Sequence, residues 1–207
     1  FGLVKGVGFD SWRRVGPVLP AIKVYNQREV DELVLVDIVA HADGSAPDVE
    51  SVADFSSDCF VPLTVGGGIT QVDQVQHLLR AGADKVSINT AAYANPALVT
   101  QIAQRHGAQC VVASIDVRRI VPGRWACFHH AGQEATGREV VAWARELEDR
   151  GAGEILLTSI ERDGTMQGYD LPLIEAVASA VKIPVIASGG AGNYQHMVDA
   201  EIGRAHV

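Results

Sequence analysis

The feature that most constrains this fold is an internal repeat. Three sets of anchors lie 122 positions apart: Glu32 and Glu154 at the start of the runs ELVL and EILL, Pro62 and Pro184, and the pairs Gly67-Gly68 and Gly189-Gly190. Apolar strands recur in any parallel sheet, but apolar composition alone does not put proline and paired glycines in register. We infer a duplicated half-unit of about four strand–helix pairs. Two such halves close into a (β/α)8 TIM barrel.

The hydrophobic pattern predicts an α/β protein. Six short runs rich in Val, Ile and Leu predict parallel strands buried on both faces: Glu32–Ile38, Val61–Val65, Lys85–Ile88, Cys110–Asp116, Glu154–Ser159 and Ile183–Ser188. Four amphipathic stretches predict helices: Gln71–Ala81, Pro96–His106, Gly137–Arg150 and Leu171–Val181. Thr70 and Asp73 predict a capping box at the start of the first helix. An open doubly wound sheet is the alternative, but it does not require the repeat.

Two segments depart from this alternation. Arg118–Gly137 predicts a hairpin inserted after a strand, and the first nine residues, FGLVKGVGF, predict another. The 207 residues are fewer than the roughly 250 of a typical barrel. We therefore expect residues 1–200 to form one barrel domain that lacks its first and last strands. We also expect residues 201–207, EIGRAHV, to be a non-native tail.

Composition excludes several classes of protein. The 17 basic and 25 acidic side chains give a net charge of −8, which disfavours a nucleic-acid partner. The sequence has no apolar run of membrane-spanning length and no signal-peptide pattern, so we expect a cytoplasmic protein. Its three cysteines form no CxxC pair, and His129-His130 has no evident ligand companion. We therefore expect no metal and no other cofactor.

The predicted chemistry lies where the strands end, because barrel active sites form at that face. Gly67-Gly68 and Gly189-Gly190 each follow a strand, and such turns let backbone N–H groups approach an anion. Related by the repeat, they predict two opposed phosphate sites and a substrate with a phosphate at each end. Residues at neighbouring strand ends would join these two sites: Asn89 and Thr90 the first phosphate site, and Asp163 and Gly164 the second. Loop capping explains these residues equally well.

Charged residues mark both ends of the strands. Asp116 ends the strand CVVASID and is a candidate general acid–base, with loop capping as the alternative. Asp37, after ELVLV, has the same ambiguity. At the opposite ends, Glu32, Lys85 and Glu154 are either solvated charges or a charged ring at the lower mouth of the barrel.

Taken together, these residues resemble the cyclase subunit family of imidazole glycerol phosphate synthase. The resemblance extends from Leu3 to about Asn193 and rests on DELVLVDI, PLTVGGGI, RAGADKVSINTAA, GEILLTSIERDGT and IPVIASGGAG. It implies a half-barrel duplication, and a bisphosphorylated aminoimidazole carboxamide ribonucleotide that ammonia attacks and cyclises. It also implies a glutaminase subunit that docks on the lower face and sends ammonia through the barrel.

The resemblance assigns roles residue by residue. Asp116 matches one of two catalytic aspartates, and Lys5 matches the lysine of the mobile first loop. One phosphate site comprises Gly67, Gly68, Asn89 and Thr90, and the other comprises Thr158, Asp163, Gly164, Ser188, Gly189 and Gly190, with Asp37 also at the substrate. Glu32, Lys85 and Glu154 match the ammonia gate. The second aspartate and the gate's arginine would lie upstream, so we expect this chain to be inactive alone.

Other functions stay open at this point. The run Val39-Ala-His-Ala-Asp-Gly departs from the cyclase pattern, and FDSWRRVG is more typical of a paralogous, amidotransferase-coupled branch that modifies surface-polysaccharide sugars. A non-catalytic barrel that holds a glutaminase is a third possibility. The related sugar isomerase of the histidine pathway shares the fold, but SINTAA and LLTSIERDG disfavour it.

Overall fold

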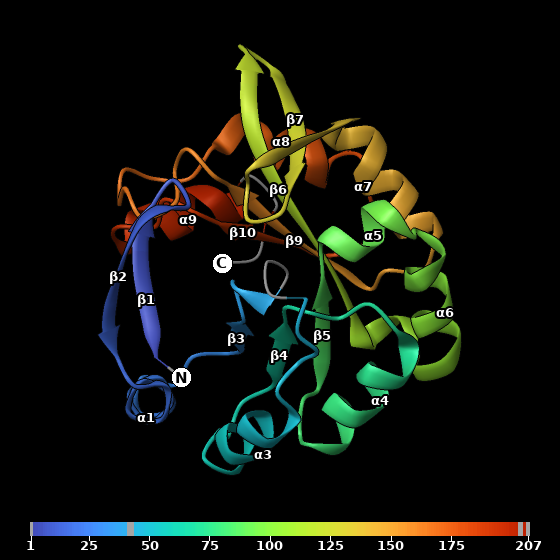
Figure 1. Cartoon of the computed structure of the whole chain (residues 1–207). Coiled ribbons are helices and arrows are strands. Elements are labelled where there is room, and N and C mark those ends of the chain that lie inside the picture. The colour runs from blue at the N-terminus through green and yellow to red at the C-terminus, as the bar shows by residue number, and fades with distance from the viewer. Residues whose placement is uncertain (1, 41–43, 203–204, 206–207) are drawn as a thin grey trace.

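The centre of the protein is a curved sheet of six parallel strands (Figure 1). The computed structural model describes residues 2–40, 44–202 and 205. Across the sheet the strands lie in the order β10-β9-β6-β5-β4-β3. Their bounds are Leu33–Val36 (β3), Leu63–Gly66 (β4), Lys85–Ile88 (β5), Val111–Val121 (β6), Glu154–Ser159 (β9) and Val185–Ser188 (β10).

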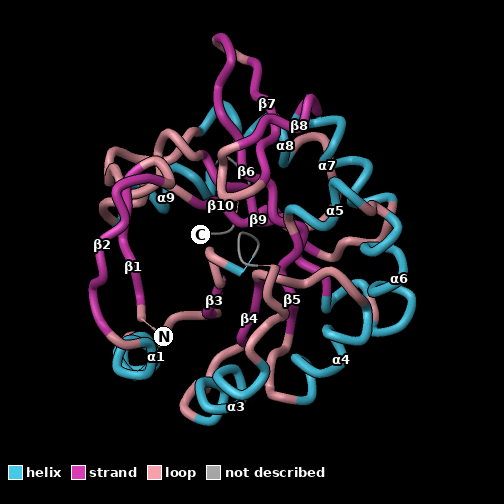
Figure 2. The backbone as a smooth tube through the Cα atoms, in the orientation of Figure 1, coloured by secondary structure: helices cyan, strands magenta, loops and turns pink. Residues whose placement is uncertain are grey.

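This strand order decides between the two candidate architectures. A doubly wound sheet reverses its strand order at a switch point, whereas here the order follows the chain in one direction. The helices of eight or more residues that follow the core strands lie around the outside of the curved sheet (Figures 1 and 2). They are Val49–Ser57 (α3), Val72–Arg80 (α4), Ala97–His106 (α6), Val140–Asp149 (α7), Leu171–Ala178 (α8) and Tyr194–Ile202 (α9). The fold is therefore the α/β architecture of a (β/α)8 barrel, as the sequence predicts.

The internal repeat is preserved in three dimensions. Leu33 pairs with Leu63 in β3–β4, and Ile155 pairs with Val185 in β9–β10, in the same parallel register. The Leu33 N–H donates to the carbonyl of Pro62, the residue before β4, at 2.9 Å. The Ile155 N–H donates in the same way to the carbonyl of Pro184, the residue before β10, also at 2.9 Å. The two halves thus use equivalent residues for equivalent bonds, which supports the inferred duplication.

The predicted elements agree closely with the observed ones. All six strands and all four helices are present, and β5 and β9 begin and end at the predicted residues. The predicted capping box is wrong by one residue. Gln71 is the N-cap of α4, and the Gln74 side chain accepts from the N–H groups of Thr70 and Gln71 at 2.8 and 3.0 Å. Asp73 instead pairs with Arg105 on α6.

Both predicted hairpins form. Leu3–Val7 (β1) pairs with Asp10–Gly16 (β2), and this hairpin leads into Val18–Gln27 (α1). β6 continues past the parallel sheet and pairs with Arg124–His129 (β7), which pairs in turn with Glu134–Glu139 (β8). The second hairpin is therefore a three-stranded extension that projects from the sheet (Figure 1). The helices α1 and α3 and the short helix Thr90–Ala94 (α5) have no counterpart among the predicted elements.

Burial corrects one further prediction. β4 is buried throughout, but β3 alternates, and Val34 and Val36 are 41% and 45% exposed. β3 is the edge strand of the described sheet, so one of its faces is not covered. Among the three cysteines, Cys127 is buried, whereas Cys59 and Cys110 are half-buried.

The end of the described chain includes part of the expected non-native tail. α9 continues past Ala200 to Ile202, and Ala205 is buried and donates to the Ala200 carbonyl. The remaining tail residues, and His41 in the loop after β3, lie outside the described residues.

Candidate active site

The predicted site residues converge on one edge of the sheet. Because all six core strands are parallel, their carboxyl ends meet at the same edge. Gly67 follows β4, Asn89 follows β5 and Gly189 follows β10, while Asp116 pairs with Thr158 where β6 and β9 lie side by side. The two glycine turns therefore lie on the same rim, with Asp116 on a strand between them.

Asp116 lies at the centre of this edge and is buried. The Asn89 amide donates to its carboxylate at 2.6 Å. Burial raises the pKa of Asp116 to about 7, with a smaller contribution from Asp163, although hydrogen bonds from Asn89 and Thr158 oppose the shift. A carboxyl group with this pKa is present in both protonation states near neutral pH, as a general acid–base requires. The Asn89 Oδ1 atom is buried without a partner among the described residues.

The two glycine pairs have matching surroundings. All four residues have positive φ, from 69° at Gly68 to 107° at Gly190. A Cβ on Gly67 would clash with the Asp37 carbonyl, and one on Gly189 would lie 2.6 Å from the Ser159 carbonyl. Asp37 and Ser159 are themselves repeat-related, so each turn packs on the end of the preceding parallel strand. A backbone this close to its neighbour leaves room only for glycine.

We expect Gly67→Ala to lower the free energy of unfolding by about 2–3 kcal/mol, because alanine adds both left-handed strain and a clash with Asp37. Gly137→Ala is the matched control, since Gly137 also has positive φ but has open space where a Cβ would stand. The control should lose about 1 kcal/mol in urea unfolding. Equal losses would show that packing against Asp37 is unimportant.

The first hairpin meets the second predicted phosphate region. The Gly8 N–H donates to the Asp163 carbonyl at 3.0 Å, and a Cβ on Gly164 would clash with the Gly6 carbonyl. Burial raises the pKa of the half-buried Asp163. Lys5, in β1, is exposed, and among residues 2–40, 44–202 and 205 it forms no ion pair with Asp116. Its predicted catalytic role stays a prediction.

Two further polar residues of this edge, Asp37 and Thr90, have hydrogen-bond partners within the protein. The Asp37 carboxylate accepts from the N–H groups of Val39 and Ala40 at 2.9 and 3.2 Å, which supports its interpretation as a loop cap. The Thr90 hydroxyl accepts from the His130 N–H at 3.2 Å. Ser188, the last residue of β10, lies opposite Thr158 in the β9–β10 ladder.

At the opposite edge, the three predicted gate residues form one ionic cluster. Lys85 Nζ lies 2.7 Å from Glu154 Oε1 and 2.8 Å from Glu32 Oε1, and the lysine side chain is only 14% exposed. Burial disfavours the ammonium group, but the two carboxylates outweigh burial and raise the pKa of Lys85. The three side chains thus form one ionic cluster, in which Lys85 and Glu154 are half-buried and Glu32 is exposed.

Lys85→Met should lower the free energy of unfolding by about 2 kcal/mol at pH 7, because it leaves two carboxylates facing each other without a cation. Since the pKa of Lys85 is raised on folding, its stabilisation is complete below the unfolded value of about 10.4 and disappears as pH rises through the folded value. Arg105→Met, which breaks an exposed pair with Asp73, is the control and should cost little. A loss of equal size in both variants would contradict this assignment.

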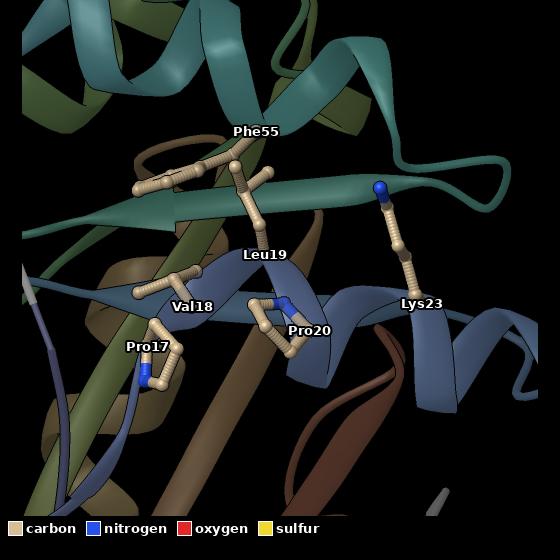
Figure 3. Close-up of a pocket in the computed structure, with 6 residues that line it drawn as sticks. All are labelled: Pro17, Val18, Leu19, Pro20, Lys23 and Phe55. Carbon is tan, nitrogen blue, oxygen red and sulfur yellow. The ribbon is translucent and has the colours of Figure 1, made fainter.

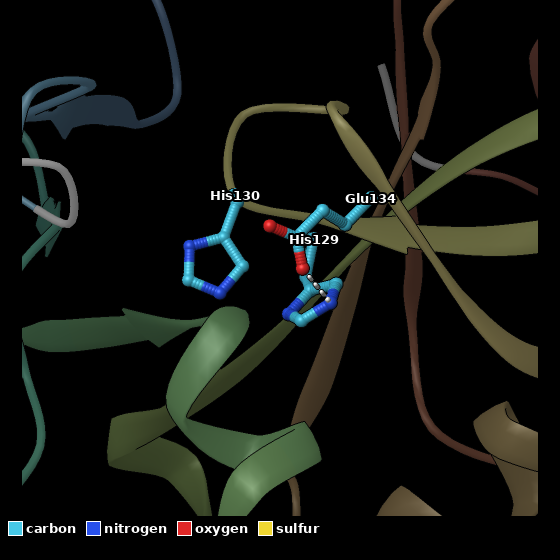
Figure 4. A group of neighbouring side chains, drawn as sticks. All are labelled: His129, His130 and Glu134. Carbon is cyan, nitrogen blue, oxygen red and sulfur yellow. Dashed lines mark ion pairs between the residues drawn. The ribbon is translucent and has the colours of Figure 1, made fainter.

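The turn between β7 and β8 places a third side chain with a potential ligand atom beside His129-His130, for which the sequence had shown no companion. Both histidines are half-buried, and Glu134 supplies the ligand companion that the sequence did not reveal. His129 Nε2 lies 3.5 Å from Glu134 Oε2 (Figure 4). Burial and the neighbouring His130 lower the pKa of His129, while Glu134 opposes this shift.

An apolar pocket lies elsewhere, between α1 and α3. Pro17, Val18, Leu19 and Pro20 line it from α1 and its N-terminus, opposite Phe55 of α3 (Figure 3). None of the predicted site residues lines this pocket, so it is separate from the candidate active site.

The comparison with known families agrees with this geometry. A sequence model described as histidine biosynthesis protein matches residues 2–206. The chain belongs to this family. The histidine biosynthesis family therefore accounts for the barrel architecture and for an enzymatic role in amino-acid biosynthesis. In the described part of this family member, no helix is both long and apolar enough to cross a membrane.

One buried acidic residue of this family member, Asp170, was not among the predicted residues. Asp170 accepts from Arg119, from the indole N–H of Trp125 and from the Leu173 N–H. It is the N-cap of α8 and has a proline two positions later, and this local signal could have revealed the cap. No local signal could have revealed the bonds to the hairpin.

Proposed function

We propose that this chain contributes its site residues to the ammonia-using cyclase reaction of histidine biosynthesis. Its substrate would be a bisphosphorylated formimino-ribulosyl aminoimidazole carboxamide ribonucleotide. The products would be imidazole glycerol phosphate and aminoimidazole carboxamide ribonucleotide. The observation that carries this proposal is Asp116, buried between two repeat-related glycine turns on one edge of the sheet.

The glycine turns support a ligand with an anion at each end. Positive-φ glycines follow β4 and β10, where strand ends leave backbone N–H groups free to face a phosphate. Neutral backbone donors also suit a protein whose net charge is −8, since they attract phosphate without cationic side chains. Gly67-Gly68 would take one phosphate and Gly189-Gly190 the other.

Asp116 would move protons between these two anchors. Attack by ammonia, ring closure and cleavage each require a proton to be gained or lost, and a carboxyl with a pKa of about 7 can do either. Asn89 would keep the carboxylate oriented through its 2.6 Å hydrogen bond. Its unpartnered Oδ1 atom could accept a hydrogen bond from an amine or hydroxyl of the substrate.

The ionic cluster at the other edge supports an ammonia-using reaction in preference to a sugar isomerisation. An isomerase needs no inlet, whereas ammonia delivered by a glutaminase must enter opposite the active site. Glu32, Lys85 and Glu154 lie at the amino ends of β3, β5 and β9, which are alternate strands of the core sheet. We assign this edge to docking of a glutaminase subunit.

The test uses protein from the complete open reading frame, supplied with the ribulosyl substrate and an ammonium salt in place of glutaminase. Formation of both products supports the proposal. Conversion of the ribosyl isomer of the substrate, without use of ammonium, would favour the sugar isomerase. Tight binding of a glutaminase with no turnover of either compound would favour a non-catalytic scaffold. No reaction with these substrates, but ammonium-dependent amidination of a sugar, would favour the paralogous branch.

A further inference from the structure

The tip of the β7–β8 hairpin brings three metal-binding side chains together. His129 is the last residue of β7, Glu134 is the first residue of β8, and the two are register partners across the antiparallel ladder. His130 follows directly in the turn. One ligand atom from each of the three side chains lies within 4.8 Å of the other two.

The turn itself directs these side chains. His130 and Ala131 have φ values of 50° and 53°, in the left-handed region that residues other than glycine rarely adopt. This backbone turns the chain back within four residues, so that consecutive histidines do not alternate between opposite faces as they would in a strand. The His129 and His130 ring centroids consequently lie 4.3 Å apart (Figure 4).

We propose that His129, His130 and Glu134 form a binding site for a divalent transition metal of the zinc class. Two imidazoles and one carboxylate are a donor set that Zn²⁺ uses, whereas Mg²⁺ and Ca²⁺ prefer oxygen ligands only. Tetrahedral ligands about 2.0–2.1 Å from zinc lie about 3.4 Å from one another. The 3.5 Å separation between His129 Nε2 and Glu134 Oε2 already matches that spacing.

The contacts of His129 support a metal over a simple ion pair. The 3.5 Å approach to Glu134 is too long for a good hydrogen bond, and the glutamate side chain is 66% exposed. The other ring nitrogen, Nδ1, is buried without a hydrogen-bond partner in the described part of the chain. The ring also packs against Tyr93 of α5, with centroids 5.7 Å apart, so its orientation is fixed before a metal binds.

The site would fasten the hairpin near the candidate active site. The His130 N–H donates to the hydroxyl of Thr90, the first residue of α5, at 3.2 Å. A metal held by His129, His130 and Glu134 would therefore lock the turn between β7 and β8 over α5. Three protein ligands leave one coordination position for water. This inference is independent of the proposed reaction.

The test measures Zn²⁺ and Co²⁺ binding to chelator-treated protein comprising all 207 residues. We expect one equivalent of Zn²⁺ to bind, a rise in Tm on binding, and the intense visible absorption of tetrahedral Co²⁺. His129→Gln, His130→Asn and Glu134→Gln should each weaken binding at least tenfold. Asparagine is chosen at position 130 because it tolerates positive φ. His77→Gln, on the exposed face of α4, is the matched control and should bind like the parent.

Unchanged affinity in both His129→Gln and Glu134→Gln would overturn the proposal, as would failure of the parent to bind one equivalent. Zinc-edge X-ray absorption of the parent gives a readout that needs no variant and so does not depend on whether a variant folds. Two imidazole nitrogens among the zinc ligands would support the site. A ligand set with sulfur, or without imidazole, would exclude it.

Discussion

Asp116→Asn should lower ammonium-dependent turnover by about 10²–10⁴-fold and yet make the protein more stable above neutral pH. The activity loss follows from the proposed role of Asp116 in proton transfer. The gain in stability follows from its burial, which raises the pKa of the carboxyl to about 7 from about 3.9 in the unfolded chain. At pH 8 the parent must keep a buried carboxylate ionised, and the amide removes a cost of about 2–4 kcal/mol.

The stability gained by Asp116→Asn should depend on pH. Between about pH 4 and 7 the folded parent binds more protons at position 116 than the unfolded chain, so its stability falls as pH rises through that window. The stability difference between Asp116→Asn and the parent should therefore be small at pH 4 and largest at pH 8. Urea unfolding at several pH values measures it, with Asp54→Asn as the control for loss of an exposed carboxylate. An Asp116→Asn protein less stable than the parent at pH 8 would contradict the burial argument.

The repeat made much of the architecture predictable from sequence. Proline and paired glycines at one spacing fix where equivalent strands start and end, and β9–β10 indeed copies the register of β3–β4. Parallel strands also explain why residues at strand starts and strand ends gather at opposite edges. The cluster around Lys85 and the position of Asp116 both follow from that rule.

Contacts that depend on packing between distant segments could not be predicted in the same way. The Asn89 amide bonds to Asp116 because β5 ends at Ile88, opposite Ala113 of β6, so Asn89 lies beside the continuing β6 strand. Only the register shows this. Glu134 was missed as a companion of His129 because two non-glycine residues adopt positive φ in the turn between them. Exposure of β3 was missed because apolar composition does not show which face of a strand has a neighbour.

Asp170→Ala should lower the free energy of unfolding by about 3–5 kcal/mol, because Asp170 joins the hairpin to α8 from a buried position. Its carboxylate accepts from Arg119 of β6 at 2.8 and 2.9 Å and from the Trp125 indole of β7 at 3.0 Å. It also caps α8 through a longer contact of 3.4 Å to the Leu173 N–H. Alanine would leave the indole N–H buried without an acceptor and would remove the cap.

Two variants separate capping from the link to the hairpin. Asp48→Ala removes the N-cap aspartate of α3, which accepts from the Ser51 N–H but, within residues 2–40, 44–202 and 205, bonds to no strand. Its loss should therefore be clearly smaller. Asp170→Asn keeps one acceptor oxygen, which can serve Trp125 or the cap but not both, so it should recover part of the loss. Hydrogen exchange should quicken in β6 and β7 of Asp170→Ala, beyond the helix that it caps, because the hairpin loses its attachment to α8. Faster exchange confined to α8 would show that Asp170 acts only as a cap and that packing around Trp125 alone holds the hairpin in place.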